Sequence, residues 1–280
     1  MPKYLEEFNP PIRLLLGPGP SNVNPRVLQA MSAPLLGHLD PAFLDIMDDV
    51  RDMLRIVFKT TNEITLPISG TGSAGMETAI VNVIEPGDIM VVGINGYFGD
   101  RIAQIGERSG ATVARVNADW GLPLDPDKLN EELKKHKRVK AVAMVHAETS
   151  TGVRSPAKEI TALAHAHDAL VIIDTVTSLG GVEVAMDDWD ADVSYSGTQK
   201  CLGCPPGLSP VTFGPRAESV IYNRKTPVQS WYLDTSLLKN YWSENRAYHH
   251  TAPISMIYGL REGLRVVLEE GLDNRFSRHE

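Results

Sequence analysis

The sequence predicts an α/β fold, a three-layer domain in which helices flank a mostly parallel sheet. Short and almost continuously apolar runs, such as IMVVGI (89–94) and LVIID (170–174), are typical of strands buried on both faces. Segments with apolar residues at helical spacing separate these runs. The chain has 280 residues, of which 42% are hydrophobic and 22% charged, so it can bury a large core.

The first half of the chain opens with a long helix. Asp40-Pro41 marks its start, because a capping carboxylate precedes a proline at the first helical position. Apolar residues then recur at helical spacing as far as Phe58. We expect strands at 63–69, 89–94 and 111–116, and helices at 71–83, 97–109 and 125–136.

The second half continues the alternation. KAVAMVH (140–146), LVIID (170–174) and 193–196 are the remaining predicted strands, and a helix is expected at 156–167. After about residue 215 the pattern contains fewer strands, and the last clear element is an apolar-striped helix at 254–270. Strands that alternate with helices indicate parallel pairing.

Charge and composition exclude several classes of function. The net charge is −8 and no basic run is present, so we do not expect a nucleic-acid partner. No apolar stretch approaches the roughly 18 residues of a membrane span, and no secretory signal core is evident. The two cysteines, Cys201 and Cys204, indicate a reducing compartment, and we expect a cytoplasmic protein. Their C-x-x-C spacing could form half of a zinc site, but no second pair of cysteines is present, so no metal site is predicted.

A glycine-rich segment, SGTGSAG (69–75), lies between a predicted strand and a predicted helix. Glycines allow close backbone approach, and free N–H groups at a helix N-terminus favour phosphate. The segment also matches G-x-G-x-x-G, but an NAD site needs an acidic residue at the end of the next strand, and Asp88 lies before that strand. A turn without a ligand is the remaining alternative.

Three other predicted strands are followed by polar residues. Asp174 closes LVIID, where a buried carboxylate either caps a loop or faces a cation. His146 to Gly152 (HAETSTG) clusters polar groups at the end of another strand, which indicates only the border of a site. Lys200 follows the strand at 193–196, in SYSGTQKCLG. Because a lysine is rarely buried unpaired, Lys200 either is solvated on a surface loop or has a partner in a site.

One cofactor accounts for the glycine-rich segment (69–75), Asp174 and Lys200 together. Ligands of open α/β sheets bind beyond the carboxyl ends of the strands, where all three features are expected. Pyridoxal 5'-phosphate has a phosphate, a ring nitrogen that needs an acidic partner, and an aldehyde that condenses with a lysine amine as a Schiff base. The sequence therefore predicts a pyridoxal phosphate enzyme.

The motifs resemble those of the class V, fold-type I aminotransferases, most closely the alanine–glyoxylate, serine–glyoxylate and serine–pyruvate group. The resemblance extends from LLLGPGPSNV (14–23) to YHHTAP (248–253). Between them lie GHLDPAF, SGTGSAGME, EPGD, GERSGA, HAETSTGV, DTVTSLGG and SYSGTQKCLGCPPGLS. The resemblance implies a large pyridoxal phosphate-binding domain and transamination.

The resemblance also implies a role for each matching residue. Lys200 would form the Schiff base and move the proton between the substrate and the cofactor, and Asp174 would pair with the ring nitrogen. The residues expected to hold the phosphate are Thr71, Gly72, Ser73 and Gln199. Those expected around the ring are Thr149 near its hydroxyl, Val176 beneath it and Phe98 stacked on it. Tyr248 and Thr251 would reach the phosphate of the other subunit, so a homodimer with shared active sites is implied.

The resemblance divides the chain into an N-terminal arm (1–22), a pyridoxal phosphate-binding large domain (23–253) and the start of a helix (254–280) that leads to a small C-terminal domain. Members of the family continue well beyond the length of this sequence. We expect that small domain, and with it the arginine that binds the substrate carboxylate, to lie outside these 280 residues. None of the arginines present lies in the family's arginine motif.

The expected activity is transfer of an amino group from alanine or serine to glyoxylate or pyruvate, by a ping-pong mechanism. Two alternatives remain: another class V reaction, of the desulfurase or kynureninase kind, and a dimerising remnant that binds the cofactor without turnover. A desulfurase needs a mobile cysteine, and Cys201 and Cys204 are poorly placed for that because they adjoin Lys200. The expected small-molecule partners are an amino acid and a 2-oxo acid.

Overall fold

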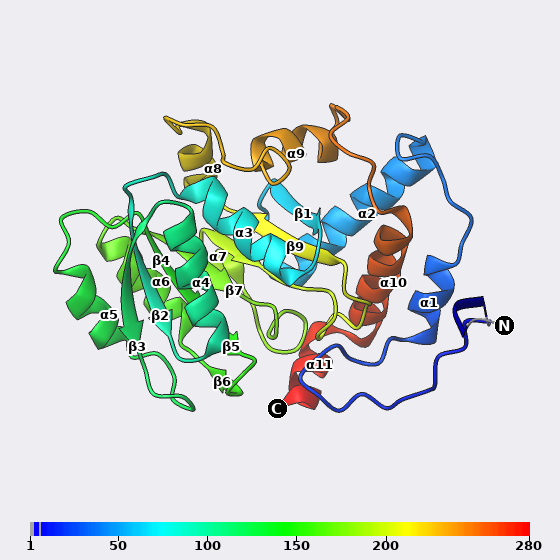
Figure 1. Ribbon diagram of the computed structural model, residues 1–280, viewed down its shortest axis with the longest axis horizontal. Helices are drawn as coiled ribbons and strands as arrows, with labels where there is room; N and C mark the ends of the chain where they lie inside the picture. The colour runs from blue at the N-terminus through cyan, green and yellow to red at the C-terminus, as the bar shows by residue number, and fades with distance from the viewer. Residues whose placement is uncertain (1–2, 6) are drawn as a thin grey trace.

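The computed structural model describes residues 3–5 and 7–280, and a seven-stranded sheet forms its centre (Figure 1). The strand order is β1-β9-β8-β7-β4-β2-β3. Strand β9 is antiparallel to both of its neighbours, and every other neighbouring pair is parallel, so the predicted mostly parallel sheet is confirmed. The seven strands are β1 (Ile64–Ser69), β2 (Ile89–Ile94), β3 (Thr112–Asn117), β4 (Ala141–Val145), β7 (Leu170–Asp174), β8 (Val193–Tyr195) and β9 (Leu208–Phe213).

Helices surround the sheet, and a short second sheet of β5 (Ala147–Glu148) and β6 (Val153–Arg154) lies at its edge (Figure 1). The helices are α1 (Pro25–Met31), α2 (Pro41–Phe58), α3 (Gly72–Val83), α4 (Tyr97–Arg108), α5 (Pro126–Leu133), α6 (Ala157–Ala166), α7 (Met186–Trp189), α8 (Pro215–Tyr222), α9 (Thr235–Trp242), α10 (Ile254–Glu270) and α11 (Leu272–His279). In the part of the chain that the structure describes, none of them has the length and apolar character that crossing a bilayer requires.

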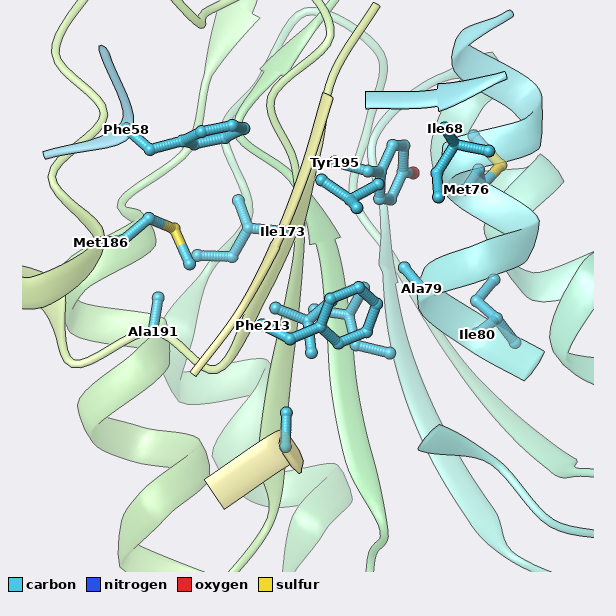
Figure 2. Close-up of a cluster of buried hydrophobic side chains, with 14 of the residues drawn as sticks. Phe58, Ile68, Met76, Ala79, Ile80, Ile173, Met186, Ala191, Tyr195 and Phe213 are labelled. Atoms are coloured by element: carbon cyan, nitrogen blue, oxygen red, sulfur yellow. The ribbon is translucent and has the colours of Figure 1, made fainter. Parts of the chain in front are cut away.

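Buried side chains pack against both faces of the sheet (Figure 2). Met76, Ala79 and Ile80 of α3 lie on one side, and Phe58 and Met186 lie on the other. Two apolar layers with the sheet between them form the core of the predicted three-layer architecture.

Local sequence explains where α2 begins and how closely α3 packs on the sheet. The Asp40 carboxylate accepts a hydrogen bond from the N–H of Ala42 at 2.9 Å, so α2 starts at Pro41 as expected. Helix α3 lies very close to the sheet because residue 75 is glycine. A Cβ added to Gly75 would lie 1.9 Å from Oγ of Ser209 in β9. This close packing fixes the N-terminus of α3 over the end of β1.

The N-terminal segment has little regular structure. Residues 3–5 form a single helical turn, and the chain from residue 7 to 22 contains no helix or strand. Phe8 and Ile12 are more than nine-tenths exposed, at 91% and 97%. Residues 1–2 and 6 of the predicted arm lie outside the described residues.

Several elements differ from the sequence prediction. Strand β9 was not predicted, and neither were helices α1, α7, α8, α9 and α11. The helix expected at 125–136 is shorter and ends at Leu133, whereas the helix expected at 254–270 has the predicted bounds. Strand β9 carries serine, proline and threonine among its apolar residues, so its pattern is weaker than that of the parallel strands.

Candidate active site

The carboxyl ends of β1, β4, β7 and β8 lie at one edge of the sheet, because these strands are parallel. The segments that follow them carry the predicted site: 70–73 after β1, 146–152 after β4, 175–178 after β7 and 196–200 after β8. The sequence prediction that these polar segments share one edge is therefore confirmed.

The N-terminus of α3 meets two of the other segments. Thr71 precedes the helix with extended backbone, and its side chain does not cap a helix N–H. A Cβ at Gly72 would lie 3.4 Å from Cγ2 of Val176 and 3.7 Å from Cα of Gly197. The glycine loop is therefore in contact range of the loop after Asp174 and of the loop that carries Lys200.

Asp174 is 2% exposed at the end of β7. Its carboxylate accepts hydrogen bonds from the N–H of Val176 and from the hydroxyl of Tyr195, each at 2.8 Å. Burial raises the pKa of Asp174 to about 6, although these two donors act in the opposite direction. Both donors are neutral, so a buried negative charge at Asp174 lacks a direct cationic partner among the described residues.

Tyr195 is a site residue that the sequence analysis missed. It lies opposite Asp174 in the register of β7 and β8, and its side chain is fully buried. Burial raises its pKa well above the ordinary value, so the hydroxyl remains a donor to Asp174 at neutral pH. The sequence places Tyr195 in the predicted strand just before SGTQK, but it does not show which way the tyrosine side chain points.

Lys200 lies at the predicted position beyond β8, and the N-terminal segment crosses it. The Nζ of Lys200 donates a hydrogen bond to the carbonyl of Pro18. The N–H of Ser21 donates to the carbonyl of Gln199 at 3.0 Å, which ties this segment to the lysine loop. Partial burial lowers the pKa of Lys200, so more of its amine is neutral than in water.

The structure shows why the GPGP motif (17–20) has a glycine at position 19. Its φ angle is +134°, and a Cβ there would lie 2.6 Å from both Cδ and Nζ of Lys200. A side chain at position 19 would therefore displace the lysine, and glycine lets the backbone pass.

Thr149 and Gln199 also lie at this edge. The hydroxyls of Thr149 and Thr177 are hydrogen-bonded to each other, which joins the segment after β4 to the segment after β7. The Oε1 atom of Gln199 is buried without a hydrogen-bond partner among the described residues. An unpartnered buried polar atom is costly unless a further group completes it.

Glu148 has a structural role that the sequence analysis did not assign. Its carboxylate is fully buried and accepts hydrogen bonds from the N–H groups of Phe98 and Gly99 at the start of α4. Ser150 adds its N–H and its hydroxyl, at 3.1 and 2.7 Å. Glu148 therefore caps α4 and holds Phe98 beside the site.

Tyr248 and Thr251 are exposed and make no hydrogen bond to the other candidate residues in the part of the chain described. Their neighbour His250 contacts the glycine loop instead, with Nε2 lying 2.8 Å from Oγ of Ser69. Tyr248 packs edge-on against the ring of His38, with 5.2 Å between ring centroids. Within one chain, the structure does not bring Tyr248 and Thr251 into the cluster around Lys200.

Comparison with known proteins identifies the family. The family model for class V aminotransferases matches residues 13–280. The chain is 45% identical to the (S)-ureidoglycine–glyoxylate transaminase of Bacillus subtilis (strain 168), covering 98% of this chain and 70% of that protein. It is 43% identical to the alanine–glyoxylate aminotransferase of Callithrix jacchus, over 98% of this chain and 67% of that one.

A solved structure agrees with the sequence comparisons. The alanine–glyoxylate aminotransferase of Nostoc sp. superposes with a TM-score of 0.96 at 48% identity, covering 98% of this chain and 73% of that one. Fold, site order and similarity thus lead to one family, whose members use pyridoxal phosphate. The chain belongs to the class V aminotransferases.

Proposed function

We propose that this aminotransferase moves an amino group from alanine or serine to glyoxylate or pyruvate, in two half-reactions of a ping-pong mechanism. The single observation that carries the proposal is the meeting of the α3 N-terminus, Asp174 and Lys200 at one edge of the sheet. Glyoxylate is favoured as acceptor because it appears in the names of the relatives from Bacillus and Callithrix.

The residues at this edge fit pyridoxal phosphate. Asp174 is a buried carboxylate whose direct partners are neutral, and a protonated ring nitrogen would supply the missing cation. The buried Oε1 of Gln199 is an acceptor without a partner among the described residues, so it has capacity for a donor, whereas a phosphate oxygen would accept from the Nε2 of the same amide. Bound there, the cofactor supplies an electron sink for the pair of electrons that the substrate α-carbon keeps when its proton leaves.

Each chain residue then has a defined task. The first turn of α3, with Thr71, Gly72 and Ser73, would bind the phosphate together with Gln199, because free N–H groups and the helix dipole favour an anion. Around the ring, the residues would be Thr149 near the hydroxyl, Val176 beneath the ring and Phe98 stacked on it.

Lys200 would serve as nucleophile and as proton carrier. Its lowered pKa raises the share of neutral amine, which is the form that bonds to a carbonyl carbon and accepts a proton. The carbonyl of Pro18 orients Nζ, and Nζ would take the proton from the substrate α-carbon. Asp174 would pair with the ring nitrogen, and its negative charge would hold a proton there.

A homodimer with shared active sites is part of the proposal. Tyr248 is 60% exposed and Thr251 is also exposed, so both are free to reach the phosphate of a partner copy. The proposed divisions are an arm at 1–22, the cofactor-binding domain at 23–253 and a connecting helix at 254–280. Two free cysteines support a reducing compartment, the cytoplasm.

Cysteine chemistry is disfavoured by the surroundings of both thiols. Cys204 is buried, and burial raises its pKa to about 12. Burial also raises the pKa of Cys201, whose Sγ donates to the carbonyl of Thr177 at 3.3 Å. Neither thiol is a mobile thiolate, so these residues do not support a desulfurase.

The test is an assay of amino transfer with the purified protein and added pyridoxal phosphate. With alanine and glyoxylate, we expect pyruvate and glycine to form in equal amounts, and with serine and glyoxylate we expect hydroxypyruvate and glycine. Half-reactions run separately on a stoichiometric amount of protein should each proceed without the other substrate, because a ping-pong route needs one substrate at a time. Cofactor binding without either half-reaction would support the remnant and contradict the proposal.

A further inference from the structure

The arginine at position 101, on α4, has no carboxylate within ion-pair distance among the described residues. Its Nη1 instead donates to the hydroxyl of Ser73 at 3.3 Å. Its Cζ lies 4.9 Å from the ring centroid of Tyr97 and 5.2 Å from that of Phe98. A half-buried guanidinium thus lies beside the first turn of α3 and against the ring expected to stack on the cofactor.

Three acidic groups near Arg101 are already engaged: Asp100 and Glu107 on its own helix, and the buried Glu148. Arg115 pairs with both Asp100 and Glu107 of α4, at 2.5 and 2.9 Å. The carboxylate of Glu148 is taken up by backbone N–H groups at the start of α4. The positive charge of Arg101 therefore lacks a counter-ion in the described chain, although negative charges lie on the same helix.

The position of this charge points to an anionic ligand. The N-terminus of α3 presents the positive end of a helix dipole, and Arg101 adds a full positive charge at the same place. Two positive groups side by side repel each other unless an anion lies between or beside them. Stacking on Tyr97 and Phe98 fixes the plane of the guanidinium, which favours recognition of a group with several oxygens.

We propose that Arg101, acting beside Ser73, binds anionic oxygens of the phosphate group held at the N-terminus of α3. The proposal rests on the proposed function, because it takes that phosphate to be the cofactor's. A substrate carboxylate has the same chemistry and is the other source of such oxygens. The phosphate is favoured because the side chain that Arg101 contacts belongs to the phosphate-binding turn itself.

The test compares two ligands that differ only in the phosphate. Dissociation constants of pyridoxal phosphate and of pyridoxal are measured by titration of cofactor-free wild type, Arg101→Gln and Arg108→Gln. Arg108 is the matched control, since it lies exposed on the same helix and donates only to the carbonyl of Gln104. For Arg101→Gln we expect pyridoxal phosphate to bind about tenfold to a hundredfold more weakly, and pyridoxal to bind within about twofold of wild type. Arg108→Gln should leave both constants unchanged.

Other results would overturn the inference. Equal weakening of both ligands by Arg101→Gln would mean that the side chain only packs α3 against α4. Unchanged affinity for pyridoxal phosphate with a raised KM for alanine would assign Arg101 to the substrate carboxylate. If Arg101→Gln does not fold, Arg101→Lys, which keeps the charge but loses the planar fork, and Arg101→Ala are titrated instead. Wild-type affinity of Arg101→Ala for pyridoxal phosphate, with a wild-type ratio of the two dissociation constants, would exclude the contact. A wild type that binds neither ligand would contradict the proposed function, whatever Arg101 does.

Discussion

Replacing Lys200 with alanine is expected to slow amino transfer from alanine to glyoxylate by at least about 10⁴-fold. The substitution removes both the nucleophile and the group that takes the α-proton. Stability should change by less than about 1 kcal/mol, because Lys200 is half-buried and its side-chain hydrogen bond goes to the Pro18 carbonyl. Initial rates of pyruvate formation and thermal unfolding of the same preparations measure the two effects.

Lys200→Arg is the control for charge. It keeps a cation opposite Pro18 but cannot act as a neutral amine at neutral pH, so its rate should also fall by about 10⁴-fold. A rate within tenfold of wild type for either variant would show that another group carries the proton, and Lys200 would lose its assigned role.

Replacing Asp174 with asparagine is expected to lower the rate of amino transfer by about 10²-fold to 10³-fold. Asparagine has no negative charge to hold a proton on the ring nitrogen. The cofactor-free variant should nevertheless be at least as stable as wild type at pH 8, because a buried charge with neutral partners has been removed.

The pH dependence of the stability difference follows from the pKa of Asp174, which burial raises from 3.8 to about 6. Between these values the folded protein binds the proton more tightly than the unfolded chain does, so the contribution of Asp174 to stability falls as the pH rises from about 4 through about 6. Unfolding of cofactor-free protein at several pH values should therefore show the Asp174→Asn variant gaining stability relative to wild type over this interval and levelling off above it. If the Asp174→Asn variant instead lost stability relative to wild type as the pH rose through this interval, the raised pKa of Asp174 would be contradicted.

Asp192→Asn separates a functional carboxylate from a structural one. Asp192 is equally buried, but it lies at the other end of β8 and pairs with Arg216 at 3.0 Å and with His165 at 2.9 Å. Its replacement should cost stability, because Arg216 loses its carboxylate partner and His165 loses a hydrogen-bond partner, and should leave cofactor affinity unchanged. Near-wild-type turnover by Asp174→Asn, beside a stable fold, would exclude the role given to Asp174.

The parts of the fold predicted from sequence are those with strong local patterns. The run LVIID and the helix at 254–270 have the expected bounds, because a continuous apolar run and an apolar stripe each have one clear solution. Strand β9 was missed because LSPVTF is interrupted by polar residues and proline. It is stabilised by pairing with β1 and β8, of which β1 lies far away in the sequence.

The same distinction applies to the site. Asp174, Lys200 and the glycine loop could be predicted because each follows directly on a recognisable strand. The contact of Lys200 with Pro18 joins residues 182 positions apart, and no local pattern reports it. The hydrogen bond between Tyr195 and Asp174 depends on the register of β7 and β8. The capping of α4 by Glu148 joins the helix to strand β5, and the bond from Gly99 spans 49 positions.

Lys200 is proposed to be the residue that bonds to the cofactor. Its most direct test is to load the protein with pyridoxal phosphate, reduce it with borohydride, digest it and locate the attached cofactor by mass spectrometry. We expect the reduced cofactor on the peptide that contains Lys200, in about one copy per chain. Attachment to another lysine, or no attachment to a protein that bound pyridoxal phosphate before reduction, would show that Lys200 does not have this role.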